Sequence, residues 1–185
     1  MGTRNLSLCK KDGEIVIAQY GQWDGYPEGQ GKTILEFCQN KDNITRLKAE
    51  LHNIRDINAL PEFLKKYDEL VPQWSVEKDN RTKGMVYWWN NFITRNIGGE
   101  IFSNIINVDK AKLPNVMNNL IYINPYEDLK ETENYCDTWI EYAYLINFDT
   151  NELECYGYGE LLKKYSLDNL PTEQQFIDEL EREEE

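Results

Sequence analysis

The sequence predicts an α+β fold in which helices pack on an antiparallel sheet built from two hairpins. Strand-like runs flank a turn near each end of the chain, and the segment between them has the apolar spacing of helices. The chain has 185 residues, of which 41% are hydrophobic, so we expect one domain over 1–185. Both hairpins should lie in one sheet, with the middle helices on one face.

The N-terminal hairpin is the clearest local feature. Residues 3–10 and 14–20 predict two strands, and Lys11-Asp12-Gly13 supplies an Asp-Gly turn between them. Residues 32–38 then predict a short helix. Asn43 is suited to cap a further helix that runs to about Arg55.

Proline and glycine divide the middle of the chain. Leu60-Pro61 predicts the start of a helix that continues to Val71, because proline suits the first helical position. The polar residues 72–83 predict a loop. Residues 85–106 predict a largely helical segment that Gly98-Gly99 interrupts, and residues 113–126 give no clear pattern.

The C-terminal part predicts the second hairpin and a last helix. Residues 138–148 and 152–158 form the strand pair, joined by turn-forming residues. Pro171-Thr172-Glu173-Gln174-Gln175 is typical of a helix start with a capping box. Glutamates at 183–185 oppose the helix dipole, so the end of this helix should fray.

Cysteine and histidine usage argues against a metal site or a cofactor. The four cysteines, Cys9, Cys38, Cys136 and Cys155, form no CxxC pair, so we expect free, buried thiols. The one histidine, His52, lies beside the apolar stripe of its predicted helix and should be a surface residue. We therefore expect no metal, no cofactor and no catalytic residue that the sequence can identify.

The excess of negative charge lies in the second half of the chain. Residues 1–96 carry 14 Lys/Arg and 13 Asp/Glu, whereas residues 97–185 carry 6 and 20. Such a field repels nucleic-acid phosphates and attracts basic surfaces, so we expect no direct nucleic-acid binding. The alternative is that the acidity only confers solubility. The candidate partner-binding residues are Glu127, Asp128, Glu131, Glu133, Asp137 and Glu141.

Targeting signals are not apparent in the sequence. It contains no apolar run long enough for a membrane span and no apolar stretch typical of a signal peptide. We therefore expect a cytoplasmic protein that does not bind membranes. The sequence does not predict the oligomeric state.

The glycine-rich segment 21–31 (GQWDGYPEGQG) is the most unusual part of the chain. It differs from the phosphate loop GxxxxGK[ST] by one residue in spacing, and Asp24 and Glu28 would repel a phosphate. One interpretation is structural, with glycines at positive φ and Trp23 and Tyr26 packed on the sheet. The other is a recognition surface that contains Gln22, Trp23, Asp24, Tyr26 and Gln30.

Two segments resemble known proteins. MGTRN followed by a hairpin and AQYGQWDGYPEGQG resembles a family of small bacterial and phage proteins of unsettled function, and WIEYAYLINFDTNELECYGY is similar to a later segment of that family. The resemblance is compatible with an anti-CRISPR inhibitor. The order of hairpins and helices is also similar to that of N-terminal-nucleophile hydrolases, but removal of Met1 leaves Gly2, which is not a nucleophile.

Two functional hypotheses follow. The first is an acidic inhibitor from a phage or mobile element that binds a basic protein surface, such as the nucleic-acid channel of a Cas9-type nuclease. The second is a hydrolase or small-ligand-binding protein that uses the segment 21–31. In that case Asp24 would be the acid or base, and Arg4 and Tyr26 would position the substrate. The sequence leans toward a protein that is not an enzyme.

Overall fold

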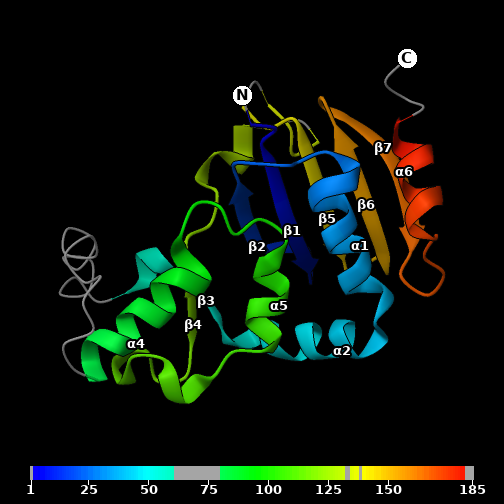
Figure 1. The fold of residues 1–185 in the computed structure, drawn as a ribbon. Helices are drawn as coiled ribbons and strands as arrows, with labels where there is room; N and C mark the ends of the chain where they lie inside the picture. The colour runs from blue at the N-terminus through cyan, green and yellow to red at the C-terminus, as the bar shows by residue number, and fades with distance from the viewer. Residues whose placement is uncertain (1, 61–79, 132–133, 138, 182–185) are drawn as a thin grey trace.

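The computed structural model describes residues 2–60, 80–131, 134–137 and 139–181 (Figure 1). Its centre is a five-stranded sheet with the strand order β2-β1-β5-β6-β7. The strands are β1 (Asn5–Lys11), β2 (Glu14–Gly21), β5 (Tyr142–Asn147), β6 (Glu152–Gly157) and β7 (Glu160–Ser166). The α+β fold class is therefore confirmed.

Both predicted hairpins are present and lie in this one sheet. β1 pairs antiparallel with β2, and β5 pairs antiparallel with β6. Asp12 and Gly13 both have positive φ, as a tight hairpin turn requires. The Asp149 carboxylate accepts the N–H groups of Asp12 and Gly13 at 2.7 and 2.9 Å, so the two hairpin turns are bonded to each other.

Two features of the sheet go beyond the sequence prediction. The hairpins meet through β1 and β5, which run parallel, so the sheet is mixed. The edge strand β7 was not predicted. It follows β6 through a turn in which Tyr158 and Gly159 both have positive φ, a conformation that is unusual for tyrosine.

The first helices follow the glycine-rich segment. A π-helical turn, η1 (Pro27–Gly31), leads into α1 (Lys32–Gln39), which confirms the helix expected there. In α2 (Lys41–Glu50) the cap is Asn40 and not Asn43, because the Asn40 side chain accepts the N–H of Asp42 at 3.0 Å. The helix also ends earlier than expected. Arg55 lies in β3 (Ile54–Asp56), which pairs with β4 (Ile121–Ile123).

The helical segment in the middle of the chain is interrupted near Gly98-Gly99, as the sequence indicates. α4 (Asn80–Trp88) continues into the π-helical turn η5 (Trp89–Ile93), and α5 (Glu100–Ile106) begins after Gly98, whose φ is +52°. Residues 80–83 belong to α4, so the loop predicted at these positions is wrong. The helix begins before the apolar residues from which its start was predicted. The predicted helix 60–71 lies almost wholly outside the described residues, as do 72–79.

The last helix, α6 (Glu173–Glu181), confirms the predicted capping box. The Gln175 N–H donates to Thr172 Oγ1 at 3.3 Å, and the Thr172 N–H donates to Gln175 Oε1 at 3.1 Å. The glutamates expected to fray its end, 183–185, lie outside the described residues.

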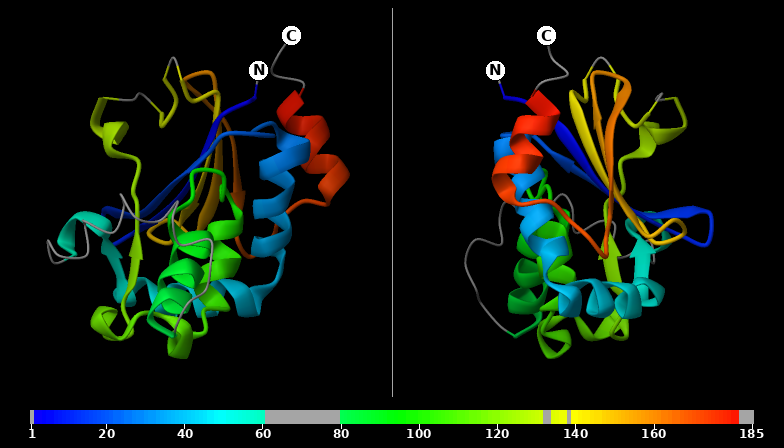
Figure 2. Two further views of the ribbon diagram at one scale, coloured as in Figure 1. Left: turned by 60° about the vertical axis from the view of Figure 1, so that its left-hand side comes forward. Right: turned by 90° about the vertical axis from the view of Figure 1, so that its right-hand side faces the viewer.

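The sheet separates two apolar layers. Helices α1, α5 and α6 lie on one side of it, and α2 runs beneath its lower end (Figure 2). The larger core lies between these helices and the sheet. The opposite face carries Leu6, Leu8 and Leu145, and Cys136 and Ile140 of the segment before β5 pack against it. All four cysteines are buried and free, as expected. His52 is exposed, also as expected.

Candidate functional site: the aromatic end of the sheet

Segment 21–31 is held in place by bonds to the strands beneath it. The Gly25 N–H donates to the Thr3 carbonyl oxygen at 2.9 Å, which ties the loop to the start of β1. The buried Tyr144 hydroxyl of β5 donates to the Gly25 oxygen at 2.9 Å. The buried Asn5 amide donates to two further loop carbonyl groups at 3.3 Å. The loop is therefore a fixed part of the fold.

The loop glycines are needed for close approach and not for positive φ, which corrects the sequence prediction. The described glycines with positive φ are Gly13, Gly98 and Gly159, and in the loop Asp24 has this conformation, with φ 55°. A Cβ on Gly29 would lie 2.1 Å from the Asp24 carbonyl oxygen, and one on Gly25 would lie 2.9 Å from that of Thr3. Backbone atoms cannot rotate away, so a side chain at either position forces the loop to move.

Two glutamines of the loop have structural partners. Gln22 Oε1 accepts the Tyr20 hydroxyl at 2.7 Å. Gln30 Oε1 accepts the Gly99 N–H at 2.7 Å, which joins the loop to the start of α5. Both carbonyl oxygens are therefore used within the fold.

The residues of the enzyme hypothesis do not come together as one group. The Tyr26 hydroxyl donates to Asp24 Oδ1 at 3.1 Å, and this bond raises the pKa of Tyr26 above its ordinary value. Arg4 belongs to a different contact. Its backbone N–H donates to Glu141 Oε2 at 2.5 Å, and its side-chain Nε lies 3.8 Å from the same oxygen. Its Cζ lies 5.1 Å from the ring centroid of Trp139. Arg4 is thus engaged by Glu141 and Trp139.

The acidic candidates fall into two groups. Glu127 and Asp128 begin the 3-10 turn η8 (Glu127–Glu131) and are exposed, and Glu127 Oε1 accepts the Asn58 amide at 3.1 Å. Glu133 lies outside the described residues, and the side chain of Glu131 is not described. These two exposed carboxylates are available to a partner.

The other acidic candidates have internal roles. Asp137 Oδ1 accepts the N–H groups of Trp139 and Ile140 at 2.5 and 2.7 Å, and Asp137 Oδ2 accepts the Tyr126 hydroxyl at 3.1 Å. Burial, followed by this hydroxyl bond, raises the pKa of Tyr126 to about 12. Asp137 thus shapes the turn before β5, and Glu141 holds the start of β1 through Arg4.

Exposed large apolar residues, most of them aromatic, occur at one end of the sheet, and sequence reasoning named only Trp23 and Tyr26 among them. Trp23 is 54% exposed, Tyr26 40%, Trp139 64%, Tyr158 66% and Leu161 42%, and these are all the exposed large apolar side chains among the described residues. Their common location depends on strand register, which the sequence does not reveal. The loop aromatics therefore fit the recognition interpretation better than packing on the sheet.

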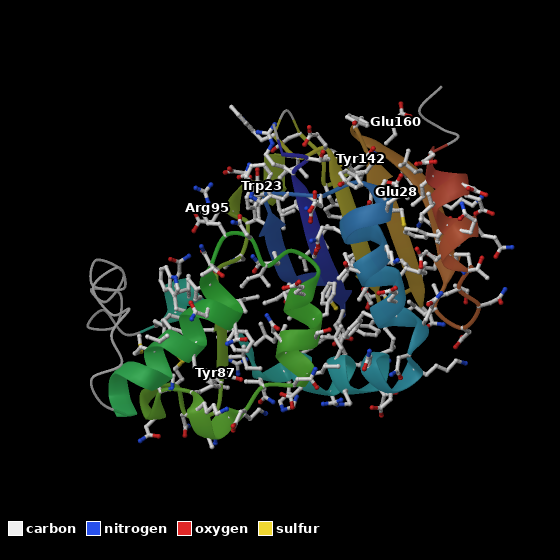
Figure 3. The ribbon with its side chains drawn as sticks, in the orientation of Figure 1. Trp23, Glu28, Tyr87, Arg95, Tyr142 and Glu160 are labelled. Atoms are coloured by element: carbon white, nitrogen blue, oxygen red, sulfur yellow. The ribbon has the colours of Figure 1, made fainter. Side chains whose placement is uncertain are left out.

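The strand register shows why these side chains share one end. The paired positions Gly21, Asn5, Tyr142, Gly157 and Glu160 form one row across all five strands. Each exposed residue lies within five positions of this row along the chain. Figure 3 shows Trp23, Tyr142 and Glu160 along the same upper end of the molecule. We call this region the aromatic end, defined by Trp23, Tyr26, Trp139, Tyr158 and Leu161.

Comparisons with known proteins leave the function open. No family description matches the chain, and no curated protein or solved structure does. The resemblances to phage proteins and to N-terminal-nucleophile hydrolases therefore stay predictions. Across the described residues, no helix has the length and apolar character to cross a bilayer. Within the same residues, no cluster of three or more His, Cys, Asp or Glu side chains is arranged to hold a metal ion.

Proposed function

We propose that the protein acts by binding a basic protein surface. The observation that carries this proposal is the segregation of charge, with 20 acidic and 6 basic residues after position 96. Exposed Glu127 and Asp128 present part of this charge to solvent. A negative surface accelerates encounter with a cationic partner and repels nucleic acid.

The sharper form of the proposal is an inhibitor from a phage or mobile element. Its target would be a nucleic-acid-binding enzyme, with a Cas9-type nuclease as the first candidate, because such enzymes hold nucleic acid in a positively charged channel. An acidic protein that occupies this channel competes with phosphates. The resemblance of the N-terminal segment to phage proteins supports testing this target.

A titration with a candidate nuclease over a salt series tests the proposal. Wild-type protein should reduce DNA binding by the nuclease without binding DNA itself, and higher salt should weaken the effect because it shortens the Debye length. The double variant Glu127→Lys/Asp128→Lys should slow association. The matched control is Glu14→Lys/Glu36→Lys, which changes the net charge equally at exposed positions of the first half. No inhibition by the wild type rejects this target, and equal association rates for both variants reject the role of Glu127 and Asp128.

A ligand-binding or hydrolytic role for segment 21–31 retains one supporting observation, the bond between Tyr26 and Asp24. Asp24→Asn keeps the shape of the side chain and removes its charge. Loss of binding or turnover across a panel of small esters and amides, with an unchanged melting curve, would favour this second function over the first.

A further inference from the structure

The aromatic end lies where the ends of five strands come together. We infer that it is the surface to which the partner binds, and that it recognises arginine side chains of that partner. This inference rests on the proposed protein-binding function and adds where the partner binds and which chemistry is recognised. Single exposed apolar residues are ordinary on protein surfaces. Here Trp23, Tyr26, Trp139, Tyr158 and Leu161 all occur at one end, and such grouping marks an interaction site.

The size of the surface suits a protein partner. Neighbouring strands lie about 4.8 Å apart, so the row across five strands spans roughly 19 Å. Trp and Tyr are the residues that most often dominate binding energy at the centre of protein interfaces. Two tryptophans and two tyrosines, each at least 40% exposed, supply several such anchors at this end of the sheet.

The backbone at three of the aromatic residues is held in place before binding. The Trp23 carbonyl oxygen accepts the Asn5 amide, and the Trp139 N–H donates to Asp137. The Tyr158 N–H donates to the Glu141 oxygen at 2.8 Å, and its ring meets that of Tyr142 edge-on at 5.3 Å. Anchors that are fixed in advance lose less conformational entropy when a partner binds.

The charge around these rings selects a cation. Residues 2–5, 21–31, 139–142 and 157–161 contain four carboxylates, from Asp24, Glu28, Glu141 and Glu160, and one guanidinium, from Arg4. Exposed Arg95, whose Cζ lies 5.7 Å from the Tyr20 ring centroid, adds a second cation, so the carboxylates remain in excess. Aromatic faces and carboxylates together favour arginine, which stacks on rings and bonds carboxylates with the same planar group. Within the fold, the Arg4 guanidinium already lies over an aromatic ring, with its Cζ 5.1 Å from the Trp139 ring centroid and its Nε 3.8 Å from Glu141 Oε2. Stacking of nucleic-acid bases on the same rings is disfavoured by the surrounding negative charge.

Fluorescence anisotropy with three labelled probes tests the inference: an oligo-arginine peptide, an oligo-lysine peptide of the same length and a single-stranded DNA oligonucleotide. Wild type should bind arginine more tightly than lysine, and DNA least. Trp139→Ala and Tyr158→Ala should each weaken arginine binding about tenfold, as expected for an interface anchor. Trp139→Phe, which keeps a ring, should retain most of the affinity. Melting curves confirm that each variant is folded.

A titration of unaltered protein gives a second measurement. The indole N–H resonances of Trp23 and Trp139 should shift on addition of the arginine peptide, and those of tryptophans far from the aromatic end should not. This readout does not depend on any variant folding.

Failure of the inference and failure of the proposed function give different results. If neither basic peptide binds, the proposed function fails. A second outcome has three parts: both peptides bind equally, Trp139→Ala and Tyr158→Ala bind them as tightly as wild type does, and Glu127→Lys/Asp128→Lys binds them more weakly. In that case the proposed function stands, but the aromatic end is not the binding surface. If DNA binds more tightly than the peptides, both are overturned in favour of nucleic-acid stacking.

Discussion

Replacement of Gly25 by alanine tests whether the glycine-rich loop depends on close packing. A Cβ at this position would lie 2.9 Å from the Thr3 carbonyl oxygen, 3.0 Å from the Asn5 Cβ and 3.1 Å from the Arg4 carbonyl oxygen. Two of these neighbours are backbone atoms of the chain that leads into β1, so the loop itself must lift. Lifting lengthens two hydrogen bonds, from the Gly25 N–H to Thr3 and from Tyr144 to Gly25.

The expected cost follows from these contacts. Overpacking of a filled site costs about 1–3 kcal/mol, and lengthening the two hydrogen bonds without breaking them costs about 1 kcal/mol in total. We therefore expect Gly25→Ala to lower the free energy of unfolding by about 2–4 kcal/mol. For a chain of this size, that corresponds to a fall in melting temperature of about 4–16 °C.

Gly13 provides the matched control. Its φ is +79° and a Cβ there would meet nothing within 4 Å, so Gly13→Ala measures the cost of positive φ without a clash. That cost is about 1 kcal/mol. Thermal unfolding followed by circular dichroism compares the two variants with wild type. If Gly25→Ala melts with or above Gly13→Ala, the close-approach explanation of the loop is wrong.

Three further predictions concern single interactions. Burial acts to raise the pKa of Glu154, but bonds from Tyr156 and Asn147 and the charge of Lys164 outweigh it and hold this pKa below its ordinary value. The stabilisation is therefore present above the ordinary glutamate pKa of about 4.3 and is lost as pH falls through the lower folded value. In denaturant titrations from about pH 6 downward, the free energy of unfolding should fall less for Glu154→Gln than for wild type. Equal slopes of this free energy against pH for the two proteins would contradict the argument. Thr172→Ala should lower the free energy of unfolding by about 1 kcal/mol through loss of the capping box, whereas Thr45→Ala, at an exposed position, should have a smaller effect. If chemical unfolding shows the same decrease in this free energy for both variants, the capping argument is wrong. Tyr144→Phe should cost about 1 kcal/mol through loss of its bond to the Gly25 oxygen, and an unchanged melting temperature would show that this bond contributes nothing.

Local patterns in the sequence predicted local structure well. The turn at Asp12-Gly13, the helix that begins at Lys32 and the capping box at Thr172 each depend on residues a few positions apart. Errors arose where two local solutions competed. Asn40 and Asn43 are equally suited to cap a helix, and the choice between them depends on where α1 ends.

The remaining features depend on pairing between distant residues. β1 and β5 are joined in parallel with Asn5 opposite Tyr142, a register that no neighbouring residue encodes. The edge strand β7 was missed because its turn places Tyr158, which is not a typical turn residue, at positive φ. The aromatic end could not be predicted for the same reason, since it combines the loop after β2 with the ends of β5, β6 and β7.

The fold also redistributes the charge that the sequence divides into halves. On the side formed by α6 and β7, lysines neutralise acidic residues: Lys32 lies 2.7 Å from Glu173, and Lys163 lies 3.4 Å from Glu179. At the aromatic end, Asp24 and Glu28 of the nearly neutral first half join Glu160 of the acidic half, because β1 lies between β2 and β5 in the sheet.

The place of binding should therefore follow the fold and not the acidic half of the sequence. Charge reversal at Asp24 and Glu160, which belong to different halves, should weaken binding of an arginine peptide by similar factors. Reversal at Glu173, whose carboxylate is already paired with Lys32, should change binding less. Peptide titrations of the three single variants at low salt distinguish these cases. If Glu160→Lys and Glu173→Lys weaken binding equally and Asp24→Lys has no effect, the partner responds to the total charge of the second half and the aromatic end has no special role.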